Sequence, residues 1–133
     1  MSPTDGPPLP DPKARTLARG QRRYRRKVAS PKQWQAIQDA KLGPCRICGA
    51  RASNGRVHGL IQLHHVVARD HFGDDVADNI VPLCPRCHDT ITNRYEPNCR
   101  ELLASLSDAE YAYMIERGGE DYPERAYGIE YRR

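Results

Sequence analysis

Two Cys-x-x-Cys pairs constrain this 133-residue chain more than any other feature. Cys45 and Cys48 form the first pair, Cys84 and Cys87 form the second, and residues 49–83 separate them. A Cys-x-x-Cys turn presents two thiolates to one ion, and two such turns complete the tetrahedral shell that Zn²⁺ prefers. Because that shell leaves no open position, we predict a structural zinc site.

Composition also favours a metal over disulfides. Only 38% of the residues are hydrophobic and 7% aromatic, so we expect one small domain with a modest core and a stabilising metal or cross-link. The sequence shows neither a signal-peptide core nor an apolar run that would span a membrane, so we expect a cytoplasmic protein with reduced thiols and no membrane contact. Buried core cysteines and a redox pair are the alternatives. The fifth cysteine, Cys99, is expected to be a bystander thiol on a helix end or loop.

A basic segment near the N-terminus points to a polyanionic partner. Residues 13–32 contain many lysines and arginines and no acidic residue, although the net charge of the whole chain is only +4. Such a run favours nucleic acid binding, and a solvated basic tail is the alternative. We expect residues 1–29 to be a disordered basic arm, residues 30–119 to form the folded domain and residues 120–133 to be a tail.

Helix and strand signals predict a small α+β fold. A helix should follow Ser30, with Gln33 completing a capping box, and end at Gly43 and Pro44. A second capping box, Ser107 with Glu110, predicts a final helix that ends at Gly118 and Gly119.

Between these two helices, apolar and β-branched runs predict a strand over residues 56–67 and a second over 79–83 that pairs back on the first. A helix should then open at Cys84–Cys87, continue to about Tyr95 and be stopped by Pro97.

Three histidines and an asparagine fall within this strand and helix region. Adjacent strand residues point to opposite faces, so His64 and His65 should not share one metal; one should bind a metal while the other transfers protons. His88 lies at a helix start, where anions such as phosphate are favoured. Isolated histidines are ordinarily packed or surface residues, which is how we interpret His58 and His71.

The stretch from Leu63 to His88, set between the two Cys-x-x-Cys pairs, resembles the HNH, or ββα-metal, endonuclease family. The similarity is closest to small phage and bacterial members with two Cys-x-x-Cys zinc knuckles. It implies that His64 and His88 bind a catalytic divalent ion, Mg²⁺ or another such as Mn²⁺, and that His65 is the general base. Asn79 would hold the strand that carries His65.

This chain departs from the family pattern at Thr92, where many members have a further histidine. Asp89 or Asn93 would then assist as a ligand, or water and the scissile phosphate would complete the shell. DNA contacts are expected from a basic set of residues: Arg22, Arg23, Arg25, Arg26, Lys27 and Arg69.

The leading hypothesis is therefore a metal-dependent HNH endonuclease that hydrolyses DNA phosphodiester bonds, by nicking or by double-strand cutting. A non-catalytic zinc-ribbon DNA-binding module is the alternative, and a nuclease directed to RNA is another. The resemblance to small phage proteins also suggests a link to phage packaging proteins. The oligomeric state stays open.

Overall fold

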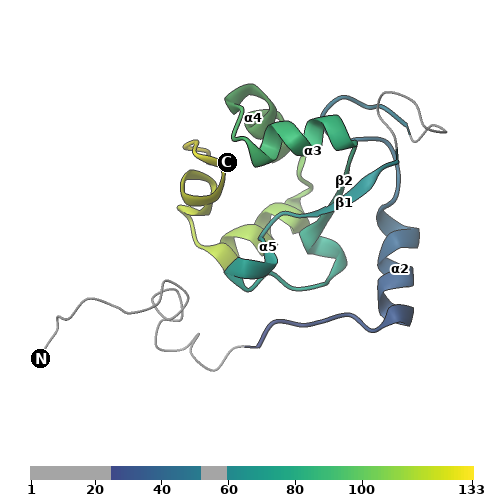
Figure 1. The fold of residues 1–133 in the computed structure, drawn as a ribbon. Coiled ribbons are helices and arrows are strands. Elements are labelled where there is room, and N and C mark those ends of the chain that lie inside the picture. Colours follow the sequence, from purple (N-terminus) through teal and green to yellow (C-terminus); the bar gives the residue numbers. More distant parts are fainter. Residues whose placement is uncertain (1–24, 52–59) are drawn as a thin grey trace, which may run out of the picture.

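A two-stranded antiparallel sheet lies at the centre of the chain in a computed structural model, which describes residues 25–51 and 60–133 (Figure 1). Strand β1 spans Gln62–His65 and β2 spans Ile80–Leu83. The register pairs His64 with Val81 and His65 with Ile80. Every residue of β2 is buried, whereas β1 is partly exposed, so β1 presents its histidines at an accessible edge.

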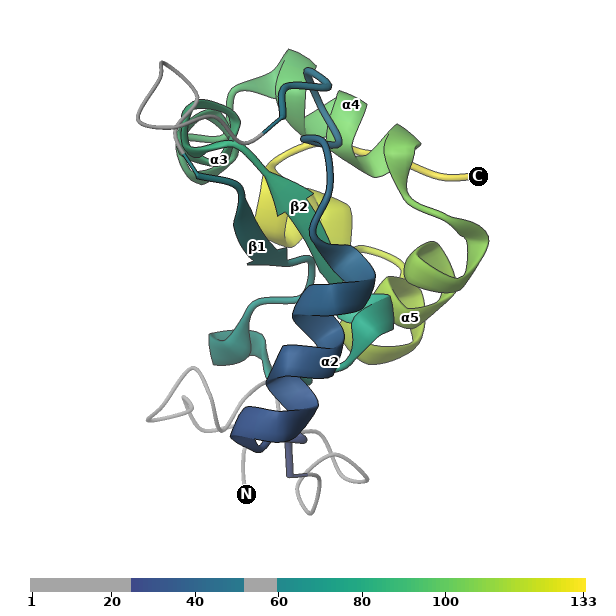
Figure 2. The same cartoon turned by 90° about the vertical axis from the view of Figure 1, so that its right-hand side faces the viewer.

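Helices surround this sheet. The structure contains α2 (Pro31–Lys41), α3 (Pro85–Thr92), α4 (Glu96–Ser105), α5 (Asp108–Gly118) and a π-helical turn, η4 (Pro123–Tyr127). Helix α2 packs against β2, α3 contacts both strands, and α4 lies between α3 and η4. Figure 2 shows α2 running along the sheet in front of β2. The predicted α+β class is confirmed.

Both predicted capping boxes form, which explains where α2 and α5 begin. The Ser30 hydroxyl accepts a hydrogen bond from the Gln33 amide, and the Gln33 side chain accepts one from the Ser30 amide. Ser107 and Glu110 repeat the arrangement at the start of α5. These reciprocal bonds satisfy amides that have no partner within the helix.

The first strand is shorter than the sequence predicts. Of the predicted range 56–67, residues 56–59 lie outside the described part of the chain, and only Gln62–His65 forms a strand. At its end Val66 donates to the Asn79 carbonyl (2.9 Å), and Val67 donates to the Asn79 side chain (2.7 Å). An asparagine side chain therefore replaces the next rung of the ladder.

Two expectations about the region after α3 are wrong. Pro97 does not simply end a helix, because it occupies the first turn of α4, where a missing amide hydrogen costs nothing. Cys99 is not on a helix end or loop, since it lies within α4 and is completely buried. The preceding helix ends earlier than predicted, at Thr92, and Arg94 adopts a left-handed backbone conformation (φ 56°).

The hydrophobic core is shared between the sheet, α4, α5 and the C-terminal residues. Val81, Leu102 and Met114 are fully buried, and the tail contributes Tyr122 and Tyr127. Figure 1 shows this C-terminal segment, in yellow, beside α4 and α5. Residues 120–133, expected to be a tail, thus contribute to the core. In the described residues, no helix has the length and apolar character required to cross a membrane.

A buried glutamate connects α5 to α2 and to the first cysteine turn. Glu110 is 1% exposed, and its carboxylate accepts two hydrogen bonds from Arg46 (2.8 and 2.9 Å) and one from Lys41. Burial alone would raise the pKa of Glu110, but Arg46 and Lys41 outweigh it and lower the pKa to about 2. The network therefore stabilises the fold with a charged carboxylate.

Replacing Glu110 with alanine should destabilise the protein by about 3 kcal/mol at neutral pH, because Arg46 and Lys41 lose the charge that compensates their partial burial. The lowered pKa means that this contribution is complete above about pH 4.5 and is lost as the pH falls towards 2. Urea unfolding of Glu110→Ala and of the exposed α5 control Glu116→Ala measures the difference. Equal stability of the two variants would contradict the prediction.

Candidate functional site

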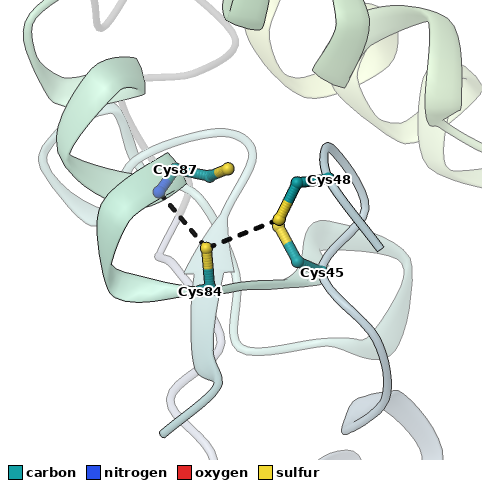
Figure 3. A group of neighbouring side chains, drawn as sticks. All are labelled: Cys45, Cys48, Cys84 and Cys87. Carbon is teal, nitrogen blue, oxygen red and sulfur yellow. Dashed lines mark hydrogen bonds between the residues drawn. The ribbon is translucent and has the colours of Figure 1, made fainter. Parts of the chain in front are cut away.

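The four paired cysteines converge on one point. Their sulfur atoms all lie within 4.8 Å of one another, and the Cys48 and Cys84 sulfurs are 3.8 Å apart (Figure 3). Cys45, Cys84 and Cys87 are buried, while Cys48 is exposed at the rim. The predicted juxtaposition of the two Cys-x-x-Cys pairs is therefore confirmed.

Local hydrogen bonds bring the two turns together. The Arg46 amide donates to the Pro82 carbonyl (3.0 Å), which holds the first cysteine turn against the edge of β2 that does not pair with β1. Cys84 caps α3, and its sulfur accepts from the Cys87 amide (3.4 Å), as the Cys45 sulfur does from Ile47 (3.4 Å). In each turn an amide-to-sulfur contact thus orients the first cysteine of the pair.

The surroundings of these thiols shift their pKa values in different directions. Burial opposes ionisation of Cys45, yet hydrogen bonds from Cys48, Cys84 and Ile47 lower its pKa to about 7. Burial raises the pKa of Cys84, and burial and the neighbouring thiols raise the pKa of Cys87. Thiolates this close repel one another, so a divalent cation is what would let all of them ionise. The donor set suits Zn²⁺.

A pocket of about 360 Å³ opens at the partly exposed strand β1. The three predicted histidines, His64, His65 and His88, all line it. The other lining residues come from α2, β1 and the segment that follows β1: Trp34, Leu63, Ala68, Arg69 and Asp70. The fold therefore brings the proposed metal ligands and the proposed base to one cavity.

His64 is the most enclosed of the three. Its Nε2 lies 3.0 Å from the Tyr127 hydroxyl, which itself donates to the Val66 carbonyl (2.6 Å). Since that hydroxyl hydrogen is already used, His64 Nε2 must be the donor, which leaves its Nδ1 lone pair available. The His64 and His88 ring centroids are 5.3 Å apart. Burial, then the charges of His88 and His65, lower the pKa of His64 to about 3, so the ring is neutral.

His65 points to different partners from its neighbour, as strand alternation requires. Its Nε2 lies 2.8 Å from Asp75 Oδ1, and its ring lies parallel to Trp34 of α2, with centroids 6.0 Å apart. Burial lowers the pKa of His65, and Asp75 opposes that effect.

Asn79 organises the loop that carries Asp75. Its fully buried side chain accepts from the Val67 amide and donates to the carbonyls of Val67 and Asp74 (both 3.0 Å). Gly73 lies so close that an added Cβ would be 1.7 Å from the Val67 carbonyl oxygen. Together Asn79 and Gly73 hold the loop against the end of β1.

The predicted DNA-contacting residues differ in their exposure and in their contacts. Arg22 and Arg23 lie outside the described residues, and Arg25 is exposed. Arg26 instead pairs with Asp75 (2.5 Å), and the Lys27 backbone bonds to Asp74 (2.7 Å). The exposed Arg69 lines the histidine pocket, with its Nε 3.5 Å from Asp75.

Within residues 25–51 and 60–133, the four cysteines form the one cluster of three or more potential metal ligands. In that part of the chain no carboxylate, cysteine or further histidine therefore lies close enough to form such a cluster with His64 and His88. Asp89 and Asn93 are exposed on or just after α3, and Thr92 donates to the His88 carbonyl (3.0 Å).

Sequence reasoning missed three residues around the pocket: Trp34, Asp75 and Tyr127. Trp34 falls in the helix predicted after Ser30, and Asp75 falls between the two predicted strands, so neither position indicates a role in the site. Tyr127 lies far along the chain from His64, so spacing offers no signal for their contact. A Gly-Asp-Asp run before Asn79 is the one local hint of a tightly held acidic loop.

Comparison with known proteins adds independent support. Residues 45–94 match the HNH endonuclease family. The chain is also similar to the type IV methyl-directed restriction enzyme EcoKMcrA of Escherichia coli, with 35% identity over 79 residues. That match covers 56% of this chain and 26% of the relative, so methyl-directed activity is a property of that protein. Residues 45–94 of this chain are therefore an HNH endonuclease domain, with four cysteines placed to bind a metal.

Proposed function

We propose that this protein is a metal-dependent endonuclease that hydrolyses phosphodiester bonds in DNA. One observation carries the proposal: His64, His65 and His88 converge on one pocket within the segment that matches the HNH family. The similarity to a restriction enzyme supports DNA as the substrate. It also supports a role in DNA restriction, whereas a link to phage packaging stays a prediction from sequence.

His64 and His88 are the side chains we assign to a catalytic divalent ion such as Mg²⁺ or Mn²⁺. A neutral imidazole is required for metal binding, and His64 is neutral with its Nε2 hydrogen directed at Tyr127. The ion would stabilise the negative charge that develops on the phosphate and on the leaving oxygen. Water and the scissile phosphate would supply the remaining ligands.

His65 is the residue we assign as general base. Its Nε2 is directed at Asp75, so its Nδ1 is the atom left to take a proton from water. Asn79 holds the chain that follows His65 through its bonds to Val67. Arg69, exposed on the same pocket, is placed to contact a phosphate.

The four cysteines are assigned to Zn²⁺, which would act in folding and not in catalysis. The cluster joins the turn at Cys45 to the start of α3, and His88 follows directly after Cys87. Binding of zinc to this frame would therefore also fix the position of one catalytic ligand.

Replacing His65 with alanine should reduce metal-dependent cleavage by at least about 100-fold, because a general base contributes that much or more. DNA binding should be unchanged, since the arginines remain. Nicking of supercoiled plasmid with Mg²⁺, Mn²⁺ or EDTA measures the effect. The control His71→Ala changes an exposed histidine that bonds to Tyr122 (2.9 Å) outside the pocket. Wild-type cleavage by His65→Ala would show that the base is assigned wrongly.

Replacing Cys84 with serine should abolish zinc binding and unfold the domain, because the free energy of zinc binding contributes directly to folding. Metal content by mass spectrometry and secondary structure by circular dichroism report the two effects. Cys99→Ala is the matched control, since Cys99 is equally buried but lies outside the cluster, and it should keep its zinc. A folded, zinc-free Cys84→Ser protein would refute the structural role.

Replacing Arg22, Arg23 and Arg25 together with alanine should weaken DNA binding and flatten its salt dependence. Each phosphate contact that is lost reduces the slope of log K against log salt by roughly 0.9, so the total change should approach about 3 units. Fluorescence anisotropy over a salt series measures the slope. Arg100→Ala, which removes a partner of Glu96 on α4, is the control. A slope identical to wild type would exclude these residues from the DNA contact.

A further inference from the structure

Asp75 is a buried carboxylate that gathers several donors around His65. Its side chain is 5% exposed. Oδ1 accepts from Arg26 Nη2 (2.5 Å) and lies 2.8 Å from His65 Nε2, while Oδ2 accepts from the Ala29 amide (3.0 Å). Arg69 approaches the same carboxylate at 3.5 Å. An arginine and a backbone amide are donors only, so they favour the ionised form of Asp75.

An ionised carboxylate can only accept hydrogen bonds, so it selects one tautomer of the histidine. The hydrogen of neutral His65 must lie on Nε2, and the lone pair must lie on Nδ1. Burial alone would raise the pKa of Asp75, but the Ala29 amide, His65 and Arg26 together lower it, in agreement with the ionised form. The parallel Trp34 ring also restricts rotation of the imidazole.

The residues that secure Asp75 come from the segment that precedes α2. Arg26 Nε also donates to the Gly73 carbonyl (2.8 Å), the Lys27 amide donates to Asp74 (2.7 Å), and the Asp75 amide donates to the Lys27 carbonyl (2.8 Å). Residues 25–29 therefore lie bound along the Gly73–Asp75 loop. This segment is outside the family match at residues 45–94.

We propose that Asp75 is a positioning residue that holds His65 in its Nε2-protonated tautomer, and that residues 25–29 complete this arrangement through Arg26. The inference rests on the proposed function of His65 as general base. Asp75 does not touch the substrate; it acts by keeping the Nδ1 lone pair of His65 directed at the pocket. The basic segment thus contributes to the active site as well as to DNA affinity.

The tautomer of His65 tests the inference without any cleavage assay. Two-dimensional ¹H–¹⁵N spectra of the imidazole nitrogens, recorded on the full zinc-loaded chain at neutral pH, distinguish a protonated Nε2 from a protonated Nδ1. The resonances are assigned with His65→Ala. Wild type should show hydrogen on Nε2, and Asp75→Asn should lose that preference, because an amide can donate to Nε2. The matched control Asp74→Asn removes a neighbouring buried carboxylate that bonds to Lys27 and Tyr113, and it should leave the tautomer unchanged.

Cleavage kinetics provide the second measurement. Asp75→Asn should lower kcat by about 100-fold, within the range for a misplaced general base, while KM and DNA affinity stay close to wild type. Arg26→Gln, which keeps the carboxylate but removes its strongest donor, should lower kcat by a smaller factor. A merely structural role would reduce thermal stability in Asp74→Asn and Asp75→Asn alike and would not separate kcat from KM.

The outcomes separate this inference from the proposed function. Hydrogen on Nδ1 of His65 in the wild type overturns the inference, and so does a wild-type kcat in Asp75→Asn. If Asp75→Asn does not fold, the wild-type tautomer and the Arg26→Gln kinetics decide. If the wild type does not cut DNA under any metal condition, the proposed function fails, and the tautomer alone decides whether Asp75 positions His65.

Discussion

Four sulfur atoms within 4.8 Å of one another set the constraint on which the other parts of the structure depend. Their convergence joins a turn next to α2, the end of β2 and the beginning of α3 in a chain with a small apolar core. Thiolates at this spacing would repel one another, so a bound cation would stabilise the ionised cluster. His88 lies one residue beyond Cys87 in α3, so the position of the cysteine cluster also sets the position of His88. The cysteine cluster thereby determines one side of the histidine pocket.

Buried polar contacts determine the other side of the histidine pocket. Asn79 replaces a rung of the sheet with its side chain, Asp75 meets His65, and Tyr127 links His64 to the Val66 carbonyl. Each of these groups is buried, and each has defined partners, as the cost of burying polar groups requires. The two adjacent histidines are therefore oriented from different directions, one by the acidic loop and one by the C-terminal turn. Strand alternation directs the two side chains to opposite faces, and these buried partners then fix the orientation of each ring.

The features that sequence could predict are local or depend on spacing. The capping boxes at Ser30 and Ser107 use contacts three residues apart, and the paired cysteines carry their own geometry, so both were found. Pro97 was misinterpreted because a proline that ends one helix can equally begin the next, and only the packing of α4 decides between them. The contacts of Tyr127 with His64, and of Arg26 with Asp75, join positions far apart in the chain. Such contacts depend on the assembled core, and no periodicity or motif encodes them.

The location of these supporting residues bears on how the HNH domain could be reused in chimeric proteins. The family match ends at residue 94, yet Arg46 depends on Glu110, His64 on Tyr127 and Asp75 on Arg26. A fusion that contained only residues 45–94 would include every motif residue but would lack Arg26, Glu110 and Tyr127. A transferable unit would therefore have to include Arg26 through Tyr127, and grafts should be joined outside that span.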